Sequence, residues 1–297
     1  MTAIAESVRR GARGSLDVVR GVASSWMGLL SLILVGLVLI AVAFAPFVTP
    51  YDPLAQDIAA RLQGPSGEHW LGTDPLGRDL FTRAVFGARV EMSVAIPAGL
   101  IALAIGLLIG AVAGYVGGRT DRVLVVLMDS MQAFPAVVLA LALLALAGPS
   151  QQNVTLVIAV TFAPAYARMA RASVFVVREQ PYIEAERSLG AGNLRVLTRH
   201  VVPNIIAPLF ILMAINIPVA VTISSGLSFL GLGVPPPEPS WGVMLADGFE
   251  RVWATPFPLL VPAIALALTT LGFTLLGESL RDYLDPRLAG TRGVTRG

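Results

Sequence analysis

Six long apolar segments constrain the fold of this chain more than any other feature. A helix needs about 20 apolar residues to cross a hydrocarbon core of ~30 Å, and each segment is close to that length. Only helices and closed barrels satisfy all backbone hydrogen bonds inside lipid. The sequence therefore predicts an all-α integral membrane protein with six transmembrane helices, near residues 26–48, 92–116, 123–147, 154–172, 205–230 and 256–276.

The composition agrees with a membrane protein and excludes several chemistries. Hydrophobic residues make up 55% of the 297 residues and charged residues 13%. All 21 basic residues are arginines, and a P-loop needs a lysine on the nucleotide phosphates, so we expect no ATP hydrolysis by this chain alone. Cysteine is absent, and His69 and His200 are expected on opposite sides of the membrane, so we expect no metal site, catalytic residue or bound cofactor. The arginines form no basic patch that would indicate nucleic-acid binding.

Arginine counts predict the orientation of the chain. With the N-terminus inside, sixteen arginines fall on the inner side and five on the outer side, together with nine acids that include Glu91. We expect both termini to be cytoplasmic, as the tails 1–25 and 281–297. The first apolar run is too long for a signal peptide and is expected to remain as the first helix. An extracytoplasmic segment at 49–89 then precedes a domain of five helices at 90–280.

The two outer segments have different expected structures. In the first, Asp74 and Pro75 fit an N-cap and first helical position, and apolar residues recur at helical spacing from Leu80 to Ala88. This pattern predicts an interfacial helix on the outer leaflet. In the second, prolines occupy four of the five positions 235–239, which predicts a stiff extended loop with Trp241 at the membrane interface.

A stripe of glycines predicts close helix packing. Gly106, Gly110, Gly114 and Gly118 recur at intervals of four in the second apolar segment. Small residues on one face let another backbone approach closely, whereas a general enrichment of glycine in membrane helices would favour no face. We also expect prolines inside the segments, Pro135 among them, to kink their helices.

Two acids are expected inside membrane helices, where charge is costly. Asp129 and Glu278 are each interpreted as structural, paired with an arginine such as Arg122, Arg168 or Arg281. The alternative is a proton relay, in which case the chain would be a proton-coupled secondary carrier using Asp129.

The fifth apolar segment carries polar residues on one face. We group five residues of this segment, one of them apolar, as candidates for lining a polar translocation path if the chain is a transporter: Asn216, Val221, Ser224, Ser225 and Ser228. The same hydroxyls are equally suited to hydrogen bonds between helices, and both interpretations stay open.

The polar stretch 178–204 has the pattern of two short helices joined at a bend. Pro181 suits a first helical turn, Glu184 and Glu186 favour the N-terminal half, and Gly190 provides a left-handed stop. Asn193 is expected to cap the next helix, whose apolar side is formed by Leu194, Leu197 and Val201. Such a unit suits docking into a cleft of a soluble partner; the alternative is a helix resting on the inner leaflet.

At these residues the chain resembles the permease subunits of bacterial ABC importers, whose loop signature has the form Glu-Ala-Ala, three residues, Gly, and a later hydrophobic-x-Leu-Pro. Glu186 stands for the second alanine and Val202 for the leucine. The resemblance implies that the loop couples transport to an ATPase. The residues that carry this expectation are Glu184, Ala185, Glu186, Leu189, Gly190, Ala191, Asn193 and Pro203.

Four further stretches resemble the dipeptide, oligopeptide and nickel branch, second-permease type. They lie at 71–83, 114–118, 227–242 and 281–287. The resemblance implies a type I importer permease fold in the bacterial inner membrane and import of short peptides, with glutathione or a nickel chelate as alternatives. It also implies a second permease, two ATPase subunits that bind ATP and Mg²⁺, and an extracytoplasmic solute-binding protein.

Overall fold

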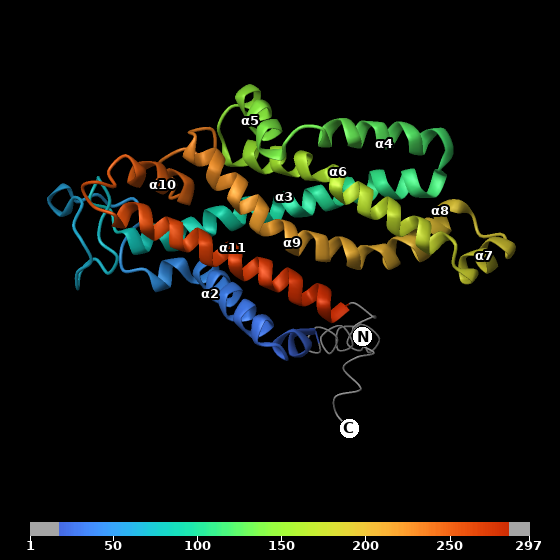
Figure 1. Ribbon diagram of the computed structural model, residues 1–297, viewed down its shortest axis with the longest axis horizontal. Helices are drawn as coiled ribbons and strands as arrows, with labels where there is room; N and C mark the ends of the chain where they lie inside the picture. Colours follow the sequence, from blue (N-terminus) through green and yellow to red (C-terminus); the bar gives the residue numbers. More distant parts are fainter. Residues whose placement is uncertain (1–17, 285–297) are drawn as a thin grey trace, which may run out of the picture.

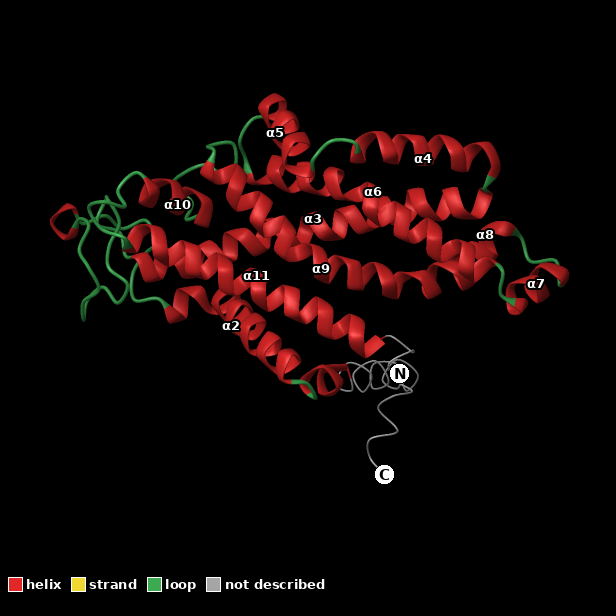
Figure 2. Ribbon diagram, viewed as in Figure 1, coloured by secondary structure: helices red, strands yellow, loops and turns green. Residues whose placement is uncertain are grey.

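The computed structural model describes residues 18–284, and within this range every regular element is helical (Figure 2). The elements follow in the order α2 (Trp26–Val48), a 3₁₀ turn (Ile58–Ala60), α3 (Leu80–Val116), α4 (Gly118–Gln132), α5 (Ala136–Ala147), α6 (Gln151–Arg178), α7 (Pro181–Ser188), α8 (Asn193–Val196), a π-helical turn (Leu197–Val201), α9 (Val202–Phe229), α10 (Trp241–Phe249) and α11 (Phe257–Leu284). The prediction of an all-α membrane protein is confirmed.

The third apolar segment is not one straight span. Among residues 18–284, five stretches are long and apolar enough to cross a membrane by themselves, and α4 with α5 forms a sixth candidate that is bent by 88°. The break falls just before Pro135, which has no N–H to donate and disfavours helical geometry in Phe134. A kink at Pro135 was expected in the helix over 123–147; the structure has a complete break there, into two helices at 88°.

The helix expected on the outer leaflet is the beginning of α3. Asp79, not Asp74, caps this helix by accepting a hydrogen bond from the Thr82 N–H at 2.8 Å. Asp74 instead bonds the N–H groups of Leu76 and Arg78 in the turn before it. The apolar face that starts at Leu80 continues into the span, so one helix of 37 residues forms.

The close packing of α3 against α6 depends on glycines. A Cβ on Gly106 would lie 2.3 Å from the Tyr166 Cβ, and one on Gly110 would lie 2.2 Å from the Ala167 carbonyl oxygen. Gly114 packs in the same way against Val174. Gly118 does not belong to this stripe, because it begins α4 with φ +61° and a Cβ there would meet nothing within 4 Å. The stripe therefore places α3 at the centre of the bundle.

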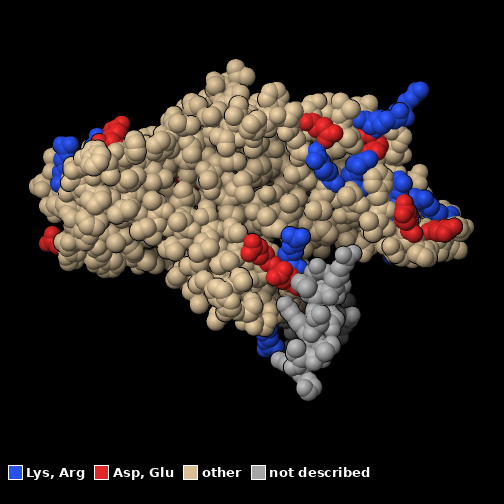
Figure 3. All heavy atoms as spheres, in the orientation of Figure 1, with Lys and Arg blue, Asp and Glu red and all other residues tan. Residues whose placement is uncertain are grey.

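The long helices run along the long axis of the molecule. The short helices α7 and α8 lie at one end, and α10 with the loops around residues 49–79 lies at the other (Figure 1). On the face shown in Figure 3, charged side chains lie at both ends and in a cluster at the lower edge, and a broad tan region between them shows none. Residues 1–17 and 285–297, with several of the counted arginines and part of the 281–287 stretch, lie outside the described residues, so the cytoplasmic position of the termini stays a prediction.

Candidate functional site

The loop 178–204 folds into two short helices separated by a left-handed glycine. Pro181 occupies the first turn of α7, as expected. Gly190 has φ +83° and donates its N–H to the Arg187 carbonyl at 2.9 Å, while the Ala191 N–H bonds the Glu186 carbonyl at 3.1 Å. These bonds close the end of α7 as the sequence indicated. Asn193 was expected to be a cap but is the first residue of α8, and Gly192 holds the cap position without a side-chain bond.

The loop buries one apolar face and exposes two leucines. Ile183, Val196 and Val201 are fully buried. Leu194 was expected on that apolar side, yet it is 74% exposed, because α8 is only four residues long and the π-helical turn after it shifts the register. Leu189 is 85% exposed on the other side of Gly190. The loop therefore exposes an apolar side chain on each side of its bend, Leu189 before Gly190 and Leu194 after it.

The other loop residues of the predicted site lie on its surface or at its junction with α9. Glu184 and Ala185 are exposed on α7. Glu186 Oε1 lies 3.4 Å from His200 Nε2, which joins α7 to the π-helical turn. Pro203 is the second residue of α9 and directly follows the π-helical turn, where it has no N–H to donate to the preceding turn.

The polar face of α9 lies against protein. Val221, Ser224, Ser225 and Ser228 are buried, and Asn216 lies half-buried beside the Tyr166 hydroxyl. The N-terminus of α10 packs directly on the serines: a Cβ on Gly242 would lie 2.1 Å from the Ser225 carbonyl oxygen. Ser228 Oγ also accepts the Val234 N–H at 3.1 Å. In this conformation the face serves contacts between helices.

Glu91, which the sequence prediction placed outside the membrane helices, is fully buried beside this serine face. The Ser240 hydroxyl donates to Glu91 Oε1 at 3.2 Å. The hydroxyls of Ser224 and Ser225 lie beside the carboxyl group, but its Oε2 has no partner at hydrogen-bonding geometry. The sequence signal for its burial is the spacing of four residues between Gly87 and Glu91, which places both on one face of a helix; in α3 both are buried.

A second polar cluster fixes the same end of the molecule. Asp74 Oδ2 lies 2.6 Å from Arg78 Nε and 3.4 Å from Arg83 Nε, and Arg78 Nη2 lies 3.9 Å from Asp247 Oδ2 on α10. Burial raises the pKa of Asp247, while the nearby Arg78 opposes that rise. Together with Glu91, these contacts hold α10 against the start of α3.

Trp241 was expected at the membrane interface, and that expectation was wrong. Its side chain is only 1% exposed, and its indole N–H donates to the Ala84 carbonyl oxygen at 2.9 Å. The prolines at 235–239 lie in a non-helical stretch, as expected. Helix α10 begins directly after it, at Trp241, and the indole ring packs against Gly87.

The two acids singled out within the apolar segments have different surroundings. Asp129 Oδ1 lies 2.7 Å from Arg168 Nη2, one of its expected partners, and both side chains are 57% exposed. Glu278 has an exposed side chain in the last two turns of α11.

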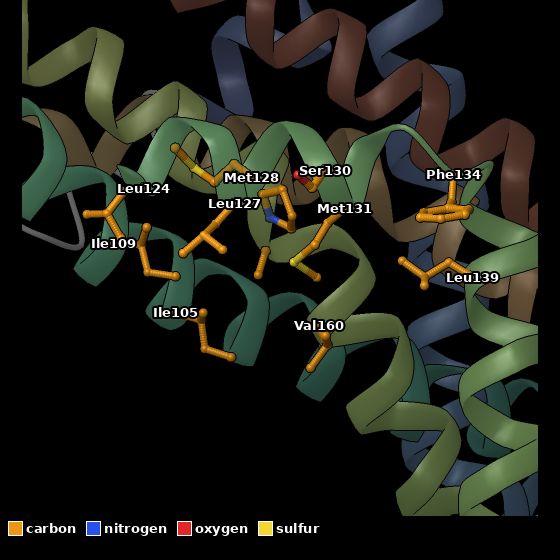
Figure 4. A pocket seen from close by; sticks show the side chains of 12 residues that line it. Ile105, Ile109, Leu124, Leu127, Met128, Ser130, Met131, Phe134, Leu139 and Val160 are labelled. Atoms are coloured by element: carbon orange, nitrogen blue, oxygen red, sulfur yellow. The ribbon is translucent and has the colours of Figure 1, made fainter. Parts of the chain in front are cut away.

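One hollow is apolar and lies apart from the loop 178–204 and from the serine face of α9. It has a volume of about 540 Å³ and is lined by side chains of α3, α4 and α6, among them Ile105, Leu127 and Val160, with Phe134 and Leu139 at one end (Figure 4). Ser130 is the polar side chain among its lining residues. Such a lining offers little to bind the charged ends of a peptide.

Comparison with known proteins gives the relationship of the chain. The family described as "binding-protein-dependent transport system inner membrane component" matches residues 106–290, and the N-terminal transmembrane domain of oligopeptide transport permease C matches residues 17–65. The dipeptide transport system permease protein DppC of Alkalihalophilus pseudofirmus is 39% identical over 257 residues, which cover 86% of this chain and 84% of that protein.

Two further relatives have different names. The glutathione transport system permease protein GsiD of Pectobacterium atrosepticum is 39% identical, over 85% of this chain and 84% of that protein. The nickel transport system permease protein NikC of Escherichia coli is 37% identical, over 89% of this chain and 96% of that protein. The described helices, the apolar spans and these matches agree: the chain belongs to the family of inner membrane components of binding-protein-dependent transport systems, and it is a multi-pass permease of an ABC importer.

Proposed function

We propose that this chain is one of two permeases of an ATP-driven importer that carries short peptides across the inner membrane. The observation that supports this substrate most directly is the set of relatives that match most of both chains: one is named for dipeptides and one for glutathione, which is itself a tripeptide. The nickel permease is nearly as similar, so a nickel chelate remains the alternative substrate.

In this proposal, ATP acts through partner subunits that dock on the loop 178–204. The chain has no lysine for a P-loop of its own, so two ATPase subunits bind ATP and Mg²⁺. Leu189 and Leu194 provide the exposed apolar contacts for that docking, on either side of the left-handed turn at Gly190. Burying exposed leucines against a partner stabilises the complex by the hydrophobic effect.

The opposite end of the molecule receives the substrate from a solute-binding protein. The ordered contacts among Asp74, Arg83, Glu91 and α10 hold this end together. A second, similar permease completes the pathway, and the two permeases alternate access by rocking against each other.

A proton-coupled carrier that uses Asp129 is the competing function of a different class. The ion pair with Arg168 supports a structural role for this carboxylate. Asp129→Asn in the assembled transporter is therefore expected to keep uptake dependent on ATP.

The experiment that tests the function is reconstitution into proteoliposomes with the partner permease, ATPases and binding protein. Uptake of a labelled dipeptide that requires ATP supports the proposal. Uptake of a nickel chelate without dipeptide uptake would replace the substrate class. Transport by this chain alone, driven by a proton gradient, would replace the whole mechanism.

Docking of the ATPases can be tested separately. Leu194→Asp is expected to lose copurification of the ATPase subunits, because a carboxylate replaces an exposed apolar contact. Leu54→Asp, an exposed leucine at the other end of the molecule, is the matched control and is expected to keep them. Equal copurification with both variants would contradict docking at this loop.

A further inference from the structure

Tyr115, near the end of α3, contacts both halves of the loop 178–204. Its hydroxyl donates to Asn193 Oδ1 at 3.2 Å, and the Arg187 guanidinium lies 5.4 Å from the centre of its ring. Arg187 belongs to the last turn of α7 and Asn193 begins α8. A single side chain of a membrane helix therefore touches the loop on both sides of Gly190.

This position matters because packing does not hold Gly190 itself. A Cβ at Gly190 or at Gly192 would meet nothing within 4 Å, so the bend between α7 and α8 stands in open space. A backbone joint without packed neighbours transmits a displacement poorly. The two contacts of Tyr115 cross this joint and fix α7 relative to α8.

The end of α3 is itself firmly attached. Arg178 Nη1 donates to the Gly114 carbonyl oxygen at 3.0 Å, and Gly114 packs against Val174 of α6. At its other end, α3 carries Arg83 and Glu91, which contact Asp74 and Ser240. A displacement of the loop that reaches Tyr115 is thus delivered to a packed helix that extends to the opposite end of the molecule (Figure 1).

We infer that Tyr115 is a positioning residue that joins the two halves of the loop and links their movement to α3. The inference rests on the proposed function, because it assumes that partner ATPases move the loop. It adds that the movement enters α3 through a side-chain contact, in addition to the chain connections to α6 and α9. The hydroxyl of Tyr115 and Asn193 then act as one unit, while Arg187 holds the ring by a cation–π contact.

The test compares Tyr115→Phe, Asn193→Ala and the double variant in the reconstituted transporter. Peptide uptake and ATP hydrolysis are measured together with the thermal midpoint and the content of ATPase subunits. Loss of one hydrogen bond is expected to lower uptake per ATP hydrolysed by about two- to tenfold, with assembly and thermal midpoint unchanged. The double variant should match either single variant, because both remove the same bond.

Tyr115→Leu removes the ring as well and is expected to lower uptake per ATP further. Ser130→Ala is the matched control, because it removes a hydroxyl that donates to the Val126 carbonyl oxygen at 2.8 Å on α4, outside the loop, and it should leave the ratio unchanged. If Tyr115→Leu does not fold, the nearly isosteric Phe variant and the double variant still decide the question.

The inference is overturned if assembled Tyr115→Phe and Asn193→Ala transporters couple as the unchanged protein does, or if their effects simply add. That result leaves the proposed function intact as long as Leu194→Asp loses the ATPases. Conversely, copurification of the ATPases with Leu194→Asp argues against the proposed docking whatever Tyr115 does.

Discussion

At the scale of single residues, the backbone at Gly190 controls the shape of the loop. Its φ of +83° lies in the region that costs L-residues roughly 1–3 kcal/mol, and no neighbouring atom restricts a side chain there. The strain from a substitution at Gly190 is therefore one of backbone conformation and not of space.

Gly190→Val is expected to alter the end of α7 and to uncouple ATP hydrolysis from uptake in a complex that still assembles. Gly192→Val is the matched control, since Gly192 has φ −67° and open space around it. Uptake and ATP hydrolysis in proteoliposomes measure the difference. Unchanged uptake with Gly190→Val would mean that the loop does not need its left-handed turn.

Glu91 is the residue whose substitution should affect stability most directly. Glu91→Ala removes the acceptor of the Ser240 hydroxyl and leaves a hole between α3, α9 and α10, which should cost about 1–3 kcal/mol. Glu91→Gln keeps an acceptor of the same size and should cost less. Thermal unfolding of the purified complex checks this order, with the exposed Glu68→Ala as control; equal stability of Glu91→Ala and the unchanged chain would contradict it.

The sequence predicts a residue's structural role best where that role depends only on the local backbone conformation. Pro181 and Gly190 fulfil their expected roles because helix starts and left-handed stops depend on a few neighbouring residues. Glu91, Trp241 and Leu194 were misplaced because their burial depends on helices that are distant in sequence or on a change of helical register.

At the scale of elements, the glycine stripe of α3 sets how closely α6 can approach. The stripe could be predicted because a spacing of four marks one face of a helix. Its end could not, since Gly118 continues the spacing after α3 has already stopped at Val116.

Gly110→Ala tests this packing, and Gly36→Ala is a control for which no loss of stability is expected. The new methyl group would lie 2.2 Å from the Ala167 carbonyl oxygen, so overpacking should destabilise the protein by about 1–3 kcal/mol. Gly36→Ala in α2 meets nothing within 4 Å and should be neutral or slightly stabilising, because alanine favours a helix. Thermal midpoints measured in the same detergent compare the two; equal shifts would show that α6 does not constrain α3.

The α4–α5 pair shows where element prediction failed. Hydropathy over 123–147 is continuous across Phe134 and Pro135, and membrane helices tolerate a proline without ending at it. An 88° break needs support from neighbouring helices, which a pattern within one segment does not describe.

At the scale of the whole molecule, the two ends carry different functions in our proposal. The loop 178–204 and the outer contacts around α10 lie at opposite ends of the bundle (Figure 1). The arginine counts predict which end faces the cytoplasm.

The absence of cysteine makes this orientation easy to test. Glu68→Cys in the outer loop should react with a membrane-impermeant maleimide in intact spheroplasts, whereas Leu189→Cys should react only after the membrane is opened. The unchanged chain is the control for background labelling. The reverse pattern would place the loop outside and exclude docking by cytoplasmic ATPases.

The length of α3 has a consequence for the surrounding lipid. Its 37 residues extend about 55 Å, well beyond a hydrocarbon core of ~30 Å, whereas the 23 residues of α2 extend only about 35 Å. A thicker or thinner bilayer therefore changes how much of α3 extends beyond the hydrocarbon core into water, without forcing the helix to tilt. Helix α2, with much of its surface exposed, has to tilt in a thinner bilayer, whereas a thicker bilayer has to thin around it. Hydrophobic mismatch is therefore absorbed at the rim of the bundle while its centre keeps its geometry.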